Sequence, residues 1–374
     1  MKNSIAADKD YFPFIDGLRG IAILMVVAIH TSQRIGNDAA GSFHFLTLEN
    51  VVNSGARGVQ LFFMLSAFTL FSSSKRRFLV DQFPRLSFYI RRAFRILPFW
   101  WLMVLFYVIR EHQRLQEAFP SLFLYFGFIR FRAGTEVFPV GWSIFVEETF
   151  YLLLPVVFGY VLSLTSAVRF AIVTWLLSFA WLFLAPKLGV PGTNSFIGLF
   201  PLAQWYCFGL GILAFYLYKH ERFKLEILSK RTTALAVDGI AIALLCAFVT
   251  SDLQGAAALA LFTMFIAAGN PRGVFGKIAR NPLLMRFGGY CYSIYLFHMA
   301  LLDYFVPLAY RRMAQAGLMP GWLGLWVDAR FLLAFTVIAF LSLGLGYFTF
   351  NGIEKPCVVL GRKVIAKLKP IEAR

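Results

Sequence analysis

The chain has 374 residues, of which 59% are hydrophobic and 15% are charged, whereas a soluble domain has about 45–50% apolar and about 25% charged residues. Its 36 Lys and Arg residues exceed its 19 Asp and Glu residues, which leaves a formal net charge of +17. This composition excludes a soluble globule, a disordered chain, collagen and a disulfide scaffold. The four cysteines form no Cys-x-x-Cys pair, so we predict neither a metal site nor a redox motif.

The hydrophobic residues lie in long runs. A hydrocarbon core of about 30 Å takes about 20 helical residues to cross, so we predict an all-α, polytopic transmembrane bundle of about ten helices that forms a single domain over residues 1–374. The predicted spans are 15–33, 58–73, 94–109, 140–162, 170–185, 196–218, 233–250, 256–269, 287–310 and 331–350. A shorter apolar run, 120–131, is better suited to an interfacial or re-entrant segment.

Loop charges predict which side of the membrane each loop faces, because cytoplasmic loops are enriched in Lys and Arg. With the N-terminus inside, 25 of the 36 basic residues fall on the cytoplasmic side and ten on the outer side, and Arg19 lies within the first span. Both termini are therefore predicted to be cytoplasmic. The basic loops are explained by the rule that positively charged loops stay in the cytoplasm on membrane insertion, and by attraction to anionic lipids of the inner leaflet. We therefore expect membrane lipids, and no nucleic acid, as partners.

Arg19 and His30 are ionisable residues within the first span. At bilayer depth an Arg, Lys or Asp side chain costs at least about 2.5–3.5 kcal/mol on insertion scales, so ionisable groups there need a partner or a function. Arg19 and His30 are eleven residues apart, which places them within about 20° of one helix face and about 16 Å apart along the axis. One stripe thus connects the two halves of the membrane. A purely structural interpretation stays open, with Arg19 beside Asp16 at the inner end and His30 at the outer interface.

The fourth and ninth spans carry further ionisable residues. Glu147 and Glu148 follow Trp142 and Ser143, and adjacent helical residues point about 100° apart, so at most one glutamate faces a given partner. Perturbed carboxylates are enriched at functional sites, although an ion pair with a buried cation would also explain them. His298 lies on the ninth span.

Three arginines lie at the cytoplasmic end of the third span. Arg91 and Arg95 are four residues apart, so on a helix they can aim at the same anion, and Arg92 lies between them. Anchoring to the inner leaflet explains this cluster equally well. On the second span, Ser66 is either a hydroxyl that packs helices together or part of a site.

Taken in order, these segments resemble the acyltransferase-3 family of bacterial membrane-bound O-acyltransferases. The segments that carry the resemblance are 16–30, 58–68, 91–98, 142–155, 292–298 and 354–356. Ala67 and Thr149 depart from the Gly and Gln that are usual in this family. We expect no SGNH-type soluble domain after the tenth span, unlike in a subset of the family.

The resemblance implies transfer of an acyl group, expected to be acetyl, from cytoplasmic acyl-CoA to a hydroxyl of a cell-envelope glycan across the bacterial inner membrane, with no bound cofactor. We hypothesise that His30 is the general base, because imidazole titrates near neutral pH, and that Glu147 or Glu148 orients it. A covalent acyl-histidine stays open. The candidate substrate-binding residues are Asp16, Arg19, Ser66, Arg91, Arg92, Arg95, Trp142, Ser143 and His298.

Within this set the arginines at 91, 92 and 95 would hold the phosphates of the donor, and Trp142, Ser143 and Ser66 would face the developing oxyanion. Two other functions compete. A proton-coupled transporter could use His30, Glu147 and His298 as a relay, although the sequence lacks the internal repeats of many transporters. A non-catalytic lipid- or glycan-binding partner of an envelope complex is the third interpretation.

Overall fold

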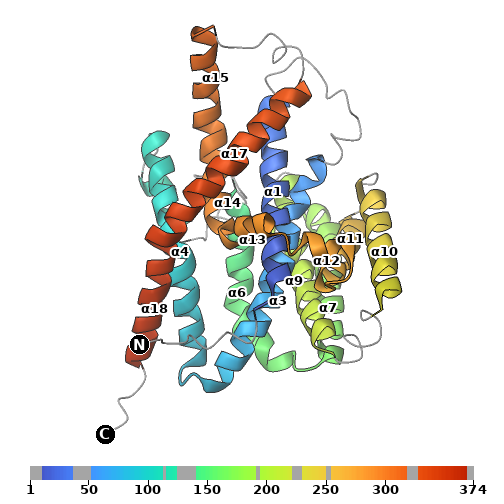
Figure 1. Cartoon of the computed structure of the whole chain (residues 1–374). Coiled ribbons are helices and arrows are strands. Elements are labelled where there is room, and N and C mark those ends of the chain that lie inside the picture. The colour runs from blue at the N-terminus through green and yellow to red at the C-terminus, as the bar shows by residue number, and fades with distance from the viewer. Residues whose placement is uncertain are drawn as a thin grey trace, which may run out of the picture.

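Every element in the described part of the chain is helical, and the helices form one bundle (Figure 1). The computed structural model describes residues 11–36, 52–112, 115–123, 140–190, 194–220, 230–249, 254–317 and 327–368. The elements are α1 (Pro13–Gly36), η1 (Ser54–Ala56), α3 (Arg57–Val80), α4 (Pro84–Arg110), α5 (Leu115–Leu122), α6 (Gly141–Tyr160), α7 (Leu164–Lys187), α8 (Asn194–Leu199), α9 (Pro201–Lys219), α10 (Arg231–Val249), α11 (Gln254–Gly269), α12 (Val274–Ile278), α13 (Pro282–Gly289), α14 (Cys291–Ala300), η4 (Leu301–Phe305), α15 (Val306–Gln315), α17 (Val327–Thr349), η5 (Phe350–Glu354) and α18 (Lys355–Leu368).

The prediction of an all-α bundle with many spans is confirmed. Within the described residues, eight helices are long and apolar enough to cross a membrane. The ten predicted spans are helical, and the ninth is interrupted at Tyr290, between α13 and α14. The two predicted spans outside these eight are α3, which carries Arg57 and Gln60 near its start, and α11, which has 16 residues. The count of ten and the cytoplasmic termini stay predictions from run length and loop charge. Of the run 120–131, only the first residues lie in the described part, where they end α5.

Local sequence signals set several helix boundaries. Proline occupies the first turn of α4, α9 and α13, where its missing N–H costs no hydrogen bond. The Asn281 side chain caps α13 by accepting from the backbone N–H groups of Leu283 and Leu284. Ser163 and Ser166 form a capping box at the start of α7. The helix starts are thus determined locally, whereas their packing depends on contacts between helices.

α1 lies against α3, α13, α14 and α17 near the middle of the bundle. Two glycines on it allow close backbone approach: a Cβ at Gly17 would lie 1.7 Å from the Ala279 carbonyl oxygen, and one at Gly20 would lie 2.0 Å from that of Leu284. Membrane helices pack closely through such small residues. The α12–α13 segment therefore lies directly on the first two turns of α1.

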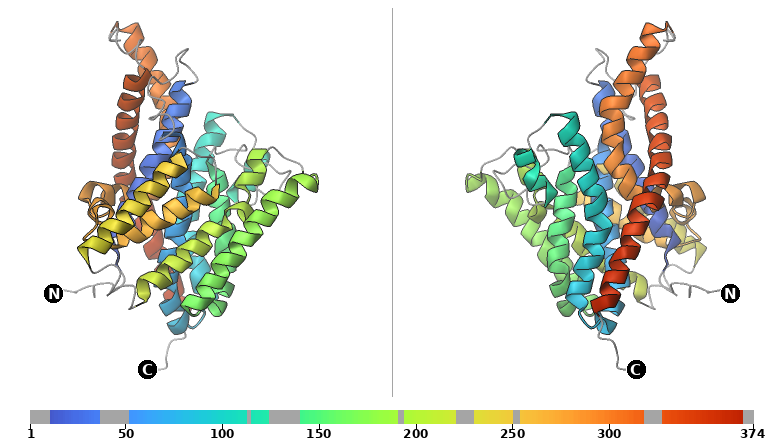
Figure 2. Two further views of the ribbon diagram at one scale, coloured as in Figure 1. Left: turned by 90° about the vertical axis from the view of Figure 1, so that its right-hand side faces the viewer. Right: turned by 90° about the vertical axis from the view of Figure 1, so that its left-hand side faces the viewer.

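Two π turns re-aim side chains after α14 and α17. In η4 and η5 the helix is wider and its hydrogen bonds run from i to i+5, and η4 carries Asp303, which bonds to Arg34 of α1. At η5 the long helical stretch Ala329–Leu368 changes direction, with α17 crossing the bundle obliquely and α18 running down along α4 (Figure 1). Figure 2 shows two helix pairs, α7 with α9 and α10 with α11, packed side by side on the flank of the bundle.

Candidate active site

A cavity of about 420 Å³ lies between α1, α3, α4, α6 and α14. Because α3 runs from the predicted outer side to the inner side, Val59 lines the outer end of the cavity and Ser73 lines the inner end. Tyr11, just before α1, also lines the inner end and is exposed. The cavity thus follows α3 along much of its length, and α1 contributes Arg19 to its wall.

Arg19 projects from α1 into this cavity. Its guanidinium donates from Nη1 to the Asp16 carboxylate at 3.2 Å and from Nη2 to the Thr69 hydroxyl at 3.1 Å. The bonds come from α1 itself and from α3, so the side chain is held in a fixed direction. Arg19 therefore pairs with Asp16, as a purely structural role would require, and it also lines the cavity.

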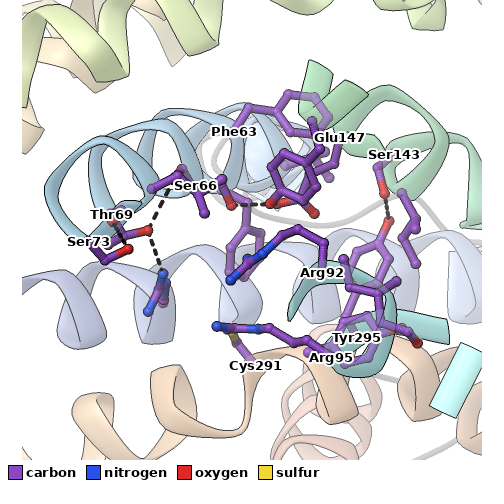
Figure 3. Close-up of a pocket in the computed structure, with 18 of the residues that line it drawn as sticks. Phe63, Ser66, Thr69, Ser73, Arg92, Arg95, Ser143, Glu147, Cys291 and Tyr295 are labelled. Atoms are coloured by element: carbon purple, nitrogen blue, oxygen red, sulfur yellow. Dashed lines mark hydrogen bonds between the residues drawn. The ribbon is translucent and has the colours of Figure 1, made fainter. Parts of the chain in front are cut away.

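Two of the three predicted anion-binding arginines line the cavity. Arg92 and Arg95 enter it side by side from α4 (Figure 3), whereas Arg91 forms an ion pair with Asp81 at 2.9 Å. We expected Arg91 and Arg95 to aim at the same anion, but the two arginines that share the cavity are Arg92 and Arg95. The Arg92 guanidinium lies 5.7 Å from the centroid of the Tyr151 ring, and its buried Nε has no hydrogen-bond partner among the described residues.

Glu147 faces the arginines from α6 (Figure 3). It accepts hydrogen bonds from the Ser66 hydroxyl at 2.5 Å and from the Tyr151 hydroxyl. Glu148 points elsewhere: its Oε1 is buried and has no hydrogen-bond partner in the described part of the chain. Only one of the two adjacent carboxylates thus belongs to the cavity, as the 100° step between neighbouring residues requires.

His30 contacts a second histidine, in place of the carboxylate that we expected. Its Nδ1 lies 3.0 Å from Nε2 of His298 on α14, and His298 is fully buried. The other nitrogen of His298, Nδ1, lies 2.7 Å from the Tyr295 carbonyl oxygen. Because a carbonyl only accepts, His298 Nδ1 carries a hydrogen and Nε2 accepts one from His30 Nδ1. The second nitrogen of neutral His30, Nε2, is then left with a free lone pair.

The histidine pair lies beyond the outer end of the cavity, whose lining includes neither histidine. At that end the hydroxyls of Ser143 and Tyr295 are 2.5 Å apart, and Tyr295 also donates to the Val140 carbonyl oxygen at 2.9 Å. Trp142 packs edge-to-face against Phe63, with ring centroids 6.4 Å apart, instead of lining the cavity.

The cavity lining also includes residues that were absent from the sequence-based set, among them Thr69, Tyr151 and Tyr295. Helical spacing offered a signal for each, since Thr69 follows Ser66 by three residues, Tyr151 follows Glu147 by four, and Tyr295 precedes His298 by three.

The three residues of the predicted transporter relay do not all contact one another. His30 and His298 are bonded, whereas Glu147 is bonded to Ser66 and Tyr151. Among the described residues, no group of three His, Cys, Asp or Glu side chains could hold a metal ion.

Comparisons with known proteins identify the family of the chain. The family described as "Acyltransferase domain" matches residues 12–351, which is nearly the whole chain. The chain belongs to the acyltransferase-3 family. With its apolar helices, membership of this family identifies a multi-pass membrane protein.

Two relatives of the chain have informative names. The chain is 25% identical over 350 residues to the peptidoglycan O-acetyltransferase OatA of Listeria monocytogenes, a match that covers 82% of this chain and 52% of the relative. It is 22% identical over 326 residues to the O-acetyltransferase OatA of Staphylococcus aureus, covering 78% and 51%. The chain thus spans about half the length of these relatives. No solved structure matches.

Proposed function

We propose that this protein is an integral membrane O-acyltransferase of the bacterial inner membrane, which moves an acetyl group from cytoplasmic acetyl-CoA to a hydroxyl of a cell-envelope glycan. One observation carries the proposal: α1 contributes Arg19 to a cavity that also holds Arg92 and Arg95, and the same helix carries His30, which pairs with His298 beyond the cavity. The names of the relatives favour acetyl as the group and a glycan as the acceptor.

The donor would enter the cavity from its inner end. The guanidinium groups of Arg92 and Arg95 suit the phosphates of CoA, because charge-assisted bonds from arginine to phosphate are strong, and the unpartnered Nε of Arg92 would gain an acceptor. The pantetheine arm carries amides and needs polar partners inside the membrane. Along its path the cavity offers the hydroxyls of Ser66, Thr69 and Ser73.

His30 would perform the base chemistry. Its Nε2 takes the proton of the acceptor hydroxyl while the acceptor oxygen attacks the thioester carbonyl carbon. When the tetrahedral intermediate collapses, the C–S bond breaks, and the proton on Nε2 passes to the departing sulfur, which leaves CoA as a thiol and the acceptor as an ester. His298 accepts from His30 Nδ1 throughout, so it holds the imidazole in one tautomer and one orientation.

Substitution of His30 tests the proposal. The full-length protein is reconstituted in liposomes with labelled acetyl-CoA and with envelope glycan isolated from a strain that lacks the gene. Wild-type protein should label the glycan, and His30→Ala should lower this rate by about 10²–10⁴-fold, the usual contribution of a positioned base. Binding of acetyl-CoA should persist in the variant, because His30 does not line the cavity.

Two results would contradict it. Full transfer by His30→Ala would remove histidine base catalysis, and absence of acetyl-CoA binding by wild-type protein would favour a transporter. Mass spectrometry of envelope glycans with and without the gene identifies the acceptor independently, because the mass difference gives the transferred group.

A further inference from the structure

Tyr295 lines the outer end of the cavity, next to Ser143. Its hydroxyl donates to the Val140 carbonyl oxygen at 2.9 Å and lies 2.5 Å from the Ser143 hydroxyl, so the ring on α14 is tied to the start of α6. Figure 3 shows Tyr295 and Ser143 facing each other at one end of the cavity. Tyr295 is 7% exposed and Ser143 is 5% exposed.

Tyr295 also lies next to the histidine pair. The Tyr295 ring lines the cavity, and its centroid lies 5.6 Å from that of the His298 ring. His298 in turn contacts His30. The Tyr295 ring is therefore in contact with both the cavity and the histidine that holds His30.

We infer that the Tyr295 ring, held by Ser143, stands between the thioester and His30 and determines whether the acyl group goes to the acceptor hydroxyl or to water. The inference rests on the proposed function. With the ring in place, water from the outer side does not reach the thioester beside an active base, and the ring moves aside when the acceptor occupies the site. Exclusion of water is how enzymes suppress hydrolysis of reactive groups.

The competing reaction is defined chemically. Without the closure, His30 Nε2 takes a proton from a water molecule and the water oxygen attacks the thioester carbon. The C–S bond then breaks, the proton passes to sulfur, and acetate and CoA thiol are the products. Release of CoA thiol without any acceptor therefore measures the failure of the closure directly.

The side chain of Tyr295 can be altered without changing the base. Its backbone carbonyl accepts from His298 Nδ1, whereas its hydroxyl binds Val140 and Ser143. Tyr295→Phe removes only the hydroxyl bonds and keeps both the ring and the carbonyl. Ser143→Ala removes one of these two bonds and leaves the other, so it provides a milder second variant that does not touch α14.

The experiment uses full-length protein in liposomes with acetyl-CoA and no acceptor, and a thiol reagent measures free CoA. Tyr295→Phe should raise the rate of CoA release by about ten-fold and Ser143→Ala by about three-fold, because two bonds and one bond that hold the ring are lost. Tyr216→Phe is the matched control, since its buried hydroxyl also donates to a backbone carbonyl, that of Val161 at 2.6 Å, outside the cavity. This control should leave CoA release at the wild-type rate.

A double variant identifies the base that acts on water. His30→Ala combined with Tyr295→Phe should return CoA release to the wild-type level. Wild-type rates in both Tyr295→Phe and Ser143→Ala, with acetyl-CoA binding retained, would overturn the closure and leave the proposed function standing. A wild-type protein that binds no acetyl-CoA would overturn both. Equal increases in the Tyr216→Phe control would also overturn the closure, because they would reflect general loosening of the bundle.

Discussion

The cavity and the histidine pair are built differently, although α1 contributes to both. The cavity has exposed or half-buried arginines and several hydroxyls along its walls, and Arg92 Nε has no hydrogen-bond partner in the described part. The histidine pair has a fully buried member, and a backbone carbonyl determines the hydrogen positions of both rings. A cavity with unused hydrogen-bond donors is suited to binding the acyl donor, whereas a histidine with a fixed tautomer is suited to transferring a proton. Substitutions in the two regions should therefore affect different kinetic constants.

Among the substitutions that test this difference, we expect the largest loss of activity at His298. His298→Leu removes the acceptor for His30 Nδ1 and frees the imidazole to rotate or change tautomer, so the turnover rate should fall by about 10²–10³-fold. The KM for acetyl-CoA should change little, because His298 does not line the cavity. Steady-state kinetics with labelled acetyl-CoA and glycan acceptor measure both constants.

A conservative variant separates orientation from simple packing. His298→Gln offers an amide oxygen that can accept from His30 Nδ1, and it should recover at least part of the lost turnover. Equal losses in the Gln and Leu variants, together with a raised KM, would show that His298 merely packs α14 against α1.

The arginines test the other half of the comparison. Arg92→Ala and Arg95→Ala should each raise the KM for acetyl-CoA by about 10- to 100-fold, the range given by losing one charge-assisted bond of about 1.5–3 kcal/mol. Turnover at saturating donor should change far less. Binding of acetyl-CoA measured by calorimetry gives an independent value.

Arg91 supplies the matched control for this prediction. It lies on the same turn of α4 but pairs with Asp81 outside the cavity, so Arg91→Ala should alter stability and leave the KM for acetyl-CoA unchanged. If all three alanine variants raised the KM equally, the cluster would act as a diffuse positive surface and the distinction between cavity and anchor would fail.

The sequence predicted the fold because length and hydropathy are properties of each run by itself. All ten runs are helical, including α3, which carries Arg57, Gln60 and Ser66 in its first half. The interruption of the ninth span at Tyr290 and the π turns η4 and η5 were not predictable, because they depend on packing against α1, α4 and α17.

The sequence predicted which residues belong to the candidate site, but not which of them contact each other. Arg19, His30, Glu147 and His298 were singled out because ionisable groups in a span need a reason. Which of them meet depends on how helices rotate against each other, which a single sequence leaves open. The general rule that a carboxylate orients a histidine suggested Glu147 for His30, whereas α14 places His298 there, and Ser66 and Tyr151 bind the carboxylate.

The smallest effect is expected just outside the histidine pair, where Arg34 and Asp303 form an ion pair at 2.6 Å. Arg34 follows His30 by one turn, and the π turn η4 brings Asp303 toward the same place. Their side chains are 42% and 20% exposed, and partly exposed ion pairs contribute about 0.2–1 kcal/mol. Arg34→Gln and Asp303→Asn should therefore each lower acyl transfer by less than about five-fold.

A double-mutant cycle with both substitutions measures the coupling between Arg34 and Asp303, and high salt should weaken it because exposed charges are screened. The coupling should stay within the few-fold range, since the His30–His298 contact lies deeper and is set by the Tyr295 carbonyl rather than by this ion pair. A loss as large as that of His298→Leu in either single variant would mean that the ion pair holds α1 and α14 in register. The histidine pair would then depend on its outer surroundings, and the contrast between an open cavity and an independently fixed base would no longer hold.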